Sequence, residues 1–408
     1  MGQEATEKEP SSWKTTLWAM MAVQCIMMMN FTSMGPFLAL YVEELGVHDP
    51  DEVLVWTGVI SCSNFLISAL VSPLWGSLAD RTGRKLMVMR STLAISSFTI
   101  LMAFAANTWQ LLIIRILQGV FSGFSASSIA LVSTVVPEEK LGYSLGWLQT
   151  AGIVGTLIGP LAGGLAADFL DSYRAVFFLA SGLSMSAFLV TTFFVKEKFE
   201  RKTESKSKPS LIQQFKTVGQ MKSVHVMFLV LFLTQFSVVS VLPALPVFMK
   251  DLTGGAEYLG TLAGFAFAVT GLADLIGSPF LGKRSDQIGY RRVLIISMIG
   301  AGLFYLPQAL APNIWVFIAS RFGLGLFVGG IMPTANALIG RLVSPEQRGM
   351  VFGFTSAATF LGSFAGPLLG GLGSAALGIR WMLGITCVLY LVNMLWVWKK
   401  VPEPGRSH

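Results

Sequence analysis

The chain has 408 residues, of which 53% are hydrophobic and only 12% are charged, and its formal net charge is +7. Soluble domains carry about 25% charged residues, so a chain this poor in charge cannot cover a water-facing surface. The composition therefore excludes a soluble globular protein. Because the basic residues are spread over short segments, it also excludes a compact nucleic-acid-binding face.

Apolar runs of about 20 residues are the signal of a helix that crosses a membrane. The chain contains twelve such runs, spans 1 to 12, at residues 15–42, 53–79, 86–106, 108–136, 142–167, 174–195, 224–250, 258–281, 292–311, 313–340, 348–373 and 380–399. The prediction is an all-α polytopic membrane protein with twelve transmembrane helices.

A polar, lysine-rich stretch at residues 196–222 interrupts the series and is composed like a flexible cytoplasmic linker. It separates a six-span N-terminal half, residues 13–195, from a six-span C-terminal half, residues 223–400. Short tails, residues 1–12 and 401–408, complete the predicted organisation.

Lysine and arginine decide the orientation of a membrane protein. Most of the 29 basic residues lie in the tails, the central linker and the loops that follow even-numbered spans, whereas the first loop carries acids such as Glu43 and Glu44 and no base. We therefore expect both termini in the cytoplasm. A cleavable signal peptide is not expected, because the first apolar run is too long for one.

The two halves repeat each other at a nearly constant offset. The repeated pairs are Asn107–Arg115 with Asn313–Arg321, Gly159-Pro160 with Gly366-Pro367, Asp80 with Asp286, and Pro36 with Pro243. Two equivalent membrane halves provide the geometry of alternating access, in which a site between them opens to one side and then to the other.

The segment after span 2 reads Gly76-Ser-Leu-Ala-Asp80-Arg81-Thr-Gly83-Arg84. Gly76 and Asp80 are four residues apart and share one helical face. Asp80 would accept hydrogen bonds from Arg84 or from the N-terminus of another helix, and breaking that contact would switch between two states. The alternative is a structural ion pair that also sets the topology.

Two arginines, Arg115 and Arg321, lie inside apolar runs at repeat-equivalent places. A guanidinium within a span is unfavourable and is usually paired, buried in protein or functional. Arg115 is followed by Gln118 and Gly119, whereas Leu324 takes the place of the glutamine after Arg321. This difference favours function for Arg115 and structure for Arg321.

Spans 5 and 11 are rich in glycine and each contains a Gly-Pro pair. Small residues four apart let helix backbones approach closely, and the proline loosens the helix. We expect interface helices between the halves that hinge; tight packing without motion is the alternative. The residues concerned are Gly155, Gly159, Pro160, Gly163, Gly164, Gly366 and Pro367.

A carboxylate in a low-dielectric place can gain and lose a proton near neutral pH, so an acid within a span is a candidate for moving protons. Asp274, in span 8, is the acid placed well inside a span. It could carry the proton or be a hydrogen-bonded structural acid. Glu43, at the outer end of span 1, is a weaker candidate, and a solvated rim is its simpler interpretation.

These residues resemble the major facilitator superfamily, in particular its drug:proton antiporters with twelve spans. Gly76 to Arg84 is similar to motif A, Arg115 to Gly119 to motif B, and Gly155 to Gly164 to the antiporter motif C, each at the expected span. Residues 36–46 are further similar to bacterial multidrug exporters of this family.

The resemblance implies a bacterial inner-membrane transporter that exports amphipathic drug-like compounds in exchange for protons. Motif A would latch the outward-facing form against span 11, and Arg115 would assist proton transfer. The alternative is a dedicated exporter of one metabolite, such as a siderophore. The family usually works as a monomer, with a small molecule, protons and the lipid bilayer as its partners.

The cargo site should be apolar with few polar groups, and 19 Met and 30 Phe suit an adaptable surface. For each candidate, a place in lipid or in the packed core is the alternative. The candidates are Asn30, Met34, Asn64, Phe65, Trp147, Gln149, Gln235, Phe236, Phe304, Gln308 and Asn336.

The chain offers no metal-binding or catalytic pattern. The three cysteines lie within spans without metal spacing, and the three histidines lie far from any constellation of acids or cysteines. Residues 277–284 nearly spell a P-loop but lack the Ser or Thr that binds magnesium. We therefore expect no metal, no cofactor, no nucleic-acid partner and no enzymatic activity.

Overall fold

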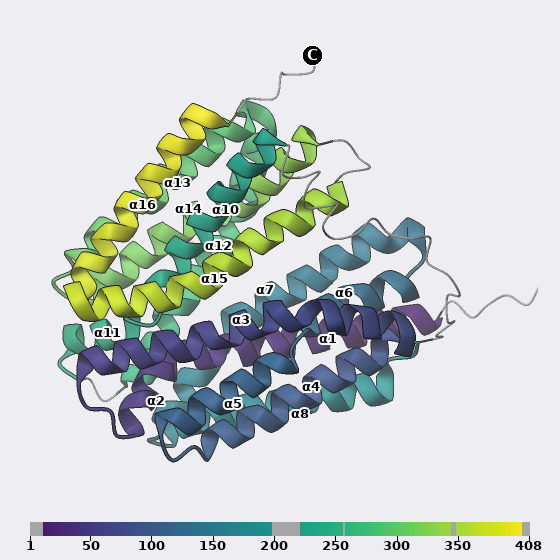
Figure 1. Cartoon of the computed structure of the whole chain (residues 1–408), viewed down its shortest axis with the longest axis horizontal. Coiled ribbons are helices and arrows are strands. Elements are labelled where there is room, and N and C mark those ends of the chain that lie inside the picture. Colours follow the sequence, from purple (N-terminus) through teal and green to yellow (C-terminus); the bar gives the residue numbers. More distant parts are fainter. Residues whose placement is uncertain (1–10, 198–220, 256–257, 344–347, 402–408) are drawn as a thin grey trace, which may run out of the picture.

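The computed structural model describes residues 11–197, 221–255, 258–343 and 348–401. The expected linker at 196–222 and the two tails lie almost wholly outside these residues. The N-terminal half contains α1 (Ser11–Met34), η1 (Gly35–Phe37), α2 (Leu38–Glu44), α3 (Pro50–Thr82), α4 (Arg84–Ala103), α5 (Thr108–Val120), α6 (Phe124–Val135), η2 (Glu138–Lys140), α7 (Leu141–Phe169) and α8 (Arg174–Phe194). The C-terminal half contains α10 (Lys222–Ser240), α11 (Leu245–Thr253), α12 (Leu259–Ile288), α13 (Tyr290–Ala309), α14 (Ile314–Leu342), α15 (Arg348–Leu377) and α16 (Ile379–Lys400) (Figure 1).

Within the described residues, twelve stretches are long and apolar enough to cross a membrane. They coincide with the twelve predicted runs to within several residues, which confirms the all-α twelve-span fold. Span 1 joins α1, η1 and α2, span 4 joins α5 and α6, and span 7 joins α10 and α11.

Spans 1 and 7 are broken at corresponding places in the two halves. Pro36 lies in the short helix η1, and Pro243 lies in the turn between α10 and α11. A proline lacks the backbone N–H that a continuing helix needs. Broken helices at matching positions of two repeats are typical of transporters, where they lie close to the cargo site.

Span 4 is broken at Gly123, whose φ of 109° a side chain would disfavour. The break frees backbone carbonyls that lipid cannot satisfy. The Trp75 indole donates to the carbonyl of Val120 at 2.7 Å, and the Arg90 guanidinium donates to that of Ser122 at 2.8 Å. Arg90 lies 3.3 Å from the Trp75 ring centroid, so α3 and α4 together stabilise the break.

Glycines set the packing inside each half. A Cβ on Gly155 would overlap the carbonyl of Cys25, and one on Gly159 would overlap the hydroxyl of Thr32, so α7 lies directly on α1. In the other half, Gly370 meets the carbonyl of Ser240 in the same way, and α15 lies on α10.

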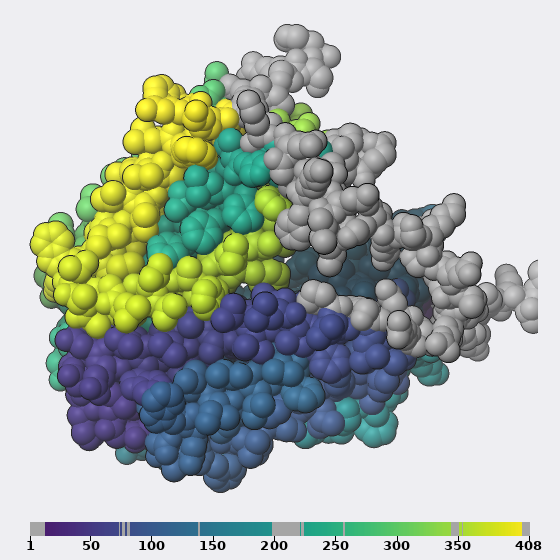
Figure 2. All heavy atoms as spheres, in the orientation of Figure 1, coloured from purple at the N-terminus to yellow at the C-terminus, as the bar shows by residue number. Residues whose placement is uncertain are grey.

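Two pairs of long helices join the halves, α7 with α12 and α3 with α15, and the short helices α2 and α11 meet as well. Gly164 meets the Gly260 backbone, and Gly58 meets the Pro367 backbone. Spans 5 and 11 therefore both line the seam, each against a helix of the opposite half. Figure 1 shows the halves converging at the end that carries α2 and α11 and diverging toward the other end. Figure 2 shows α3 and α15 in direct contact along that converging end.

The glycine contacts predict a matched pair of substitutions on α7. Gly155→Ala should lower the melting temperature of the detergent-solubilised protein, because the new methyl group collides with the Cys25 carbonyl at a cost of about 1–3 kcal/mol. Gly146→Ala should leave it unchanged or raise it, since that site is open and alanine favours a helix by about 1 kcal/mol. Equal melting temperatures for both variants would contradict this packing.

Candidate functional site

Arg115 lies on the inner face of α5. The exposed apolar side chains of this helix, Trp109, Ile113 and Leu117, recur every four residues and form a lipid-facing stripe. At 3.6 residues per turn, Arg115 points away from that stripe. Its Nε is buried, with no hydrogen-bond partner among the described residues.

Gln118 holds the Arg115 guanidinium. The Nη1 of Arg115 donates to the side-chain oxygen of Gln118 at 2.9 Å, and the Gln118 amide donates to the hydroxyl of Thr99 at 2.9 Å. Gly119 brings α5 onto α3 beside Asn64, whose amide donates to the backbone carbonyl of Arg115 at 3.4 Å. The three motif B residues thus fix one cation on an inner helix face.

Arg321 has a more closed environment. It is buried, its Nε donates to the hydroxyl of Thr270 at 2.9 Å, and its guanidinium lies 5.0 Å from the Phe267 ring centroid. These contacts join α14 to α12 inside one half, which is what a structural arginine does.

Asp274 lies on the inner side of α12. The exposed residues Phe265, Leu272 and Ile276 form the lipid-facing side of this helix, and Asp274 stands on the opposite side. Its side chain is exposed, and one carboxylate oxygen lies against Gly329 of α14. Among the described residues, no side chain pairs with the carboxylate. It can therefore take up a proton without first breaking an ion pair.

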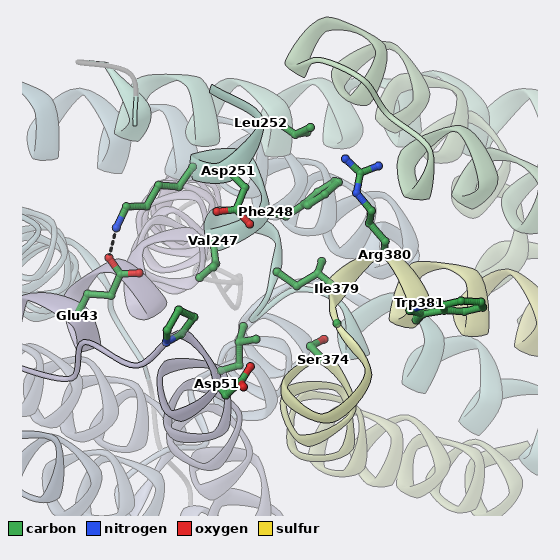
Figure 3. Close-up of a pocket in the computed structure, with 14 residues that line it drawn as sticks. Glu43, Asp51, Val247, Phe248, Asp251, Leu252, Ser374, Ile379, Arg380 and Trp381 are labelled. Carbon is green, nitrogen blue, oxygen red and sulfur yellow. Dashed lines mark hydrogen bonds and ion pairs between the residues drawn. The ribbon is translucent and has the colours of Figure 1, made fainter. Parts of the chain in front are cut away.

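Glu43 lies at the seam, at the converging end of the halves. Its carboxylate is 2.5 Å from the Nζ of Lys250, which stands 207 positions later in the chain and is the repeat-equivalent residue. The pair joins α2 to α11 and lines two pockets of about 560 Å³ and 390 Å³. Figure 3 shows the larger pocket, with Glu43 and Asp51 from one half opposite Val247 and Ile379 from the other.

The motif A segment is described only in part. The surroundings of Gly76 and the side chains of Asp80 and Arg81 lie outside what the structure describes. Gly83, with a φ of 96°, ends α3 and begins α4. The two carboxylate oxygens of Glu197 then accept from the backbone N–H groups of Arg84 and Lys85 at 3.0 and 2.7 Å, which caps α4.

Several cargo-site candidates pack inside one half. Asn30 is buried and donates to the carbonyl of Ala180, and Gln308 is buried and donates to that of Phe304. Others make side-chain contacts of the same internal kind. They are Phe304 with Phe327, Gln235 with Ser363, and Phe236 with Phe232. Met34 is buried in the hydrophobic core.

Other candidates are exposed. Phe65, Gln149 and Asn336 are exposed on α3, α7 and α14. Asn336 lies two turns beyond Gly329, on the face that meets Asp274. Trp147 is exposed too, but it shares a stripe with Ile158 and Leu165 that faces lipid. Trp147 therefore lies on the lipid side of α7.

Sequence reasoning passed over Asp168, Lys250 and Arg90. Asp168 ends α7, and its carboxylate oxygens accept from the backbone N–H groups of Gly260 and Thr261 at 3.0 and 2.6 Å, across the seam. Its place four residues after Gly164, on the same helix face, was the available signal. Nearby, burial raises the pKa of Tyr173 to about 12, and carboxylates including that of Asp168 act in the same direction.

The chain has two six-helix halves with matching helix breaks, and each half places one charged side chain on an inner helix face. These features define a secondary transporter of the bacterial inner membrane. The chain belongs to the Major Facilitator Superfamily, whose family model matches residues 20–255 and 227–408.

Relatives and solved structures agree with this membership. The chain is 38% identical to the multidrug resistance protein MdtG of Proteus mirabilis over 97% of its own length and 98% of the relative's. It is 34% identical to MdtG of Citrobacter koseri over 96% of each chain. The crystal structure of a bacterial homolog of the human lysosomal transporter Spinster, inward-facing and unoccupied, superposes with a TM-score of 0.78 at 15% identity, covering 97% of this chain and 98% of that one. At that identity the likeness concerns the fold.

The two arginines should respond differently to truncation. Arg115→Ala should abolish export of a transported dye while changing the free energy of unfolding by less than about 1 kcal/mol, because the residue is only partly buried and its buried Nε makes no hydrogen bond among the described residues. Arg321→Ala should destabilise the protein by at least about 2 kcal/mol, because it leaves a cavity and removes the bond that the Thr270 hydroxyl accepts. Melting temperature and dye export, measured on both variants, check this; a stable Arg321→Ala variant would contradict it.

Proposed function

We propose that the protein exports amphipathic, drug-like compounds across the inner membrane in exchange for protons, by alternating access. The observation that carries the proposal is the seam, which is closed by contacts between the halves at one end while the halves diverge toward the other. The two MdtG relatives, named multidrug resistance proteins, support this class of cargo.

The distribution of basic residues supports a cytoplasmic location for both termini. With this orientation the converging end, with α2 and α11, faces outward, and the halves diverge toward the cytoplasm. The structure then corresponds to the inward-facing state of the cycle.

Asp274 is our proposed proton carrier. Its carboxylate faces inward from α12 and has no ion-pair partner among the described residues. Arg115 faces inward from the other half. Its positive charge would favour the ionised form of the Asp274 carboxyl if the two groups approach each other during the cycle. Motif A, around Asp80, would latch the opposite, outward-facing state.

The cargo would lie between the halves, beside the broken spans 1, 4 and 7. Phe65, Gln149 and Asn336 are exposed candidates that combine an aromatic face with amide groups. Few polar groups on an apolar surface suit a site that accepts many amphipathic compounds. A dedicated metabolite exporter would use the same frame, but the relatives' names favour multidrug export.

Proton release in everted membrane vesicles tests the proposal. Adding a cationic dye to energised vesicles should release accumulated protons when they contain the wild type. Asp274→Asn should reduce this release at least about tenfold, because the amide cannot titrate. Asp251→Asn, which changes an exposed acid at the outer end of α11, is the matched control and should release protons normally.

Three outcomes are informative. Release lost in Asp274→Asn alone supports both the antiport and the carrier. Normal release in Asp274→Asn would refute Asp274 as the carrier while leaving the antiport intact. Wild-type vesicles that release no protons with any dye of the panel would refute proton-coupled multidrug export.

A further inference from the structure

The N-terminus of α12 is capped by a residue of the other half. The first backbone N–H groups of a helix have no partner within it and are usually satisfied by a nearby side chain. The residue before α12, Tyr258, makes no such side-chain bond. Instead Asp168, at the end of α7, accepts from Gly260 at 3.0 Å and from Thr261 at 2.6 Å, one bond to each carboxylate oxygen.

This cap adds charge to hydrogen bonding. The N-terminus of a helix carries a partial positive charge, and a carboxylate there is favoured. Charge-assisted hydrogen bonds of this kind are stronger than neutral ones. If the halves separate at the outer end, the two hydrogen bonds between Asp168 and the first turn of α12 break. The carboxylate and the two N–H groups must then bond to water.

Glu43 and Lys250 add a second ionic contact across the seam. Their charged atoms are 2.5 Å apart, and the Glu43 side chain is 24% exposed. A single exposed pair stabilises little. Here the pair is partly shielded and acts at the same end of the molecule as the Asp168 cap.

The other seam, between α3 and α15, lacks this arrangement. Its N-terminal helix end belongs to α3, which is capped within its own half by Asp49, the acceptor of a bond from the N–H of Asp51. The repeat-equivalent of Asp168 is Ala375, which has no charge. Close glycine contacts with the opposite backbone, such as Gly371 against Leu54, help to close that side.

We infer that Asp168, Glu43 and Lys250 are positioning residues that form an outer latch, which must release before the outer side can open. The outer latch is Asp168 with the N-terminus of α12, together with Glu43 with Lys250. The inference rests on the proposed function in requiring alternating access. At the outer end, the Asp168 carboxylate binds the N-terminus of a helix in the other half. Asp80 of motif A is expected to make the same kind of contact at the opposite end.

Distances between spin labels test the outer latch without transport. Labels would be placed on Phe104→Cys and Leu310→Cys, exposed positions at the outer ends of α4 and α13, in a full-length chain whose three native cysteines are replaced by serine. Asp168→Ala should raise the ratio of long-distance to short-distance populations about tenfold, because two charge-assisted bonds are lost. Asp168→Asn, which keeps one acceptor, should give a smaller increase.

Glu44→Gln is the matched control. Glu44 neighbours Glu43, but it accepts from Ser172 and Tyr173 and pairs with Arg174, all within its own half. The Glu44→Gln substitution should therefore leave the distance distribution unchanged. Lys250→Glu should shift the distribution toward long distances, and adding Glu43→Lys should restore it.

An unchanged distribution in Asp168→Ala, or the same shift in Glu44→Gln, would overturn the cap as part of the outer latch. Failure of the exchanged pair to restore the distribution would overturn the role of Glu43 and Lys250. The readout is independent of cargo and protons. If the distances change as expected but the dye triggers no proton release, the outer latch is supported and the proposed function is refuted.

Discussion

A backbone that crosses lipid must satisfy its own hydrogen bonds, because the hydrocarbon supplies no partners. In this chain the constraint acts most visibly where a helix breaks or begins. At the break in span 4, Trp75 and Arg90 supply donors to two freed carbonyls. At the beginning of α12, Asp168 supplies the acceptor. Each such substitute comes from another helix, so the breaks determine which helices must be neighbours.

Close backbone packing provides most of the remaining cohesion, and α7 shows how one helix serves two purposes. Gly155, Gly159 and Gly163 face α1 and hold the N-terminal half together. Gly164 and Pro160 face α12 and meet the other half. In the C-terminal half, α15 repeats the arrangement against α10 and α3. Assembly of each half and contact between halves are thus encoded on adjacent faces of the same helix.

The fold was predictable because its signals are local. Charge depletion, twelve apolar runs and the internal repeat each follow from residues close in sequence or at a fixed offset. The difference between Arg115 and Arg321 was also visible, since Gln118 has no counterpart after Arg321. The proline positions at the breaks in spans 1 and 7 could likewise be seen as a matching pair.

The cargo surface was less predictable, because lipid and an apolar cavity favour the same residue types. Trp147 and Gln149 are both exposed and lie two residues apart on α7, which places them on nearly opposite sides of the helix. Asn30 and Gln308 looked like cavity residues, yet each is buried against a backbone carbonyl. Asp168 could not be assigned a partner at all, since its acceptor role depends on how the two halves meet.

The breaks in spans 1 and 7 separate each span into two segments with different neighbours. The long segments α1 and α10 pack within their own halves, whereas the short segments α2 and α11 meet each other across the seam. Residues that hold each half together and residues that join the two halves therefore lie on different segments of the same span. A substitution in α2 or α11 can thus change the contact between the halves while leaving the packing of α1 and α10 within each half intact.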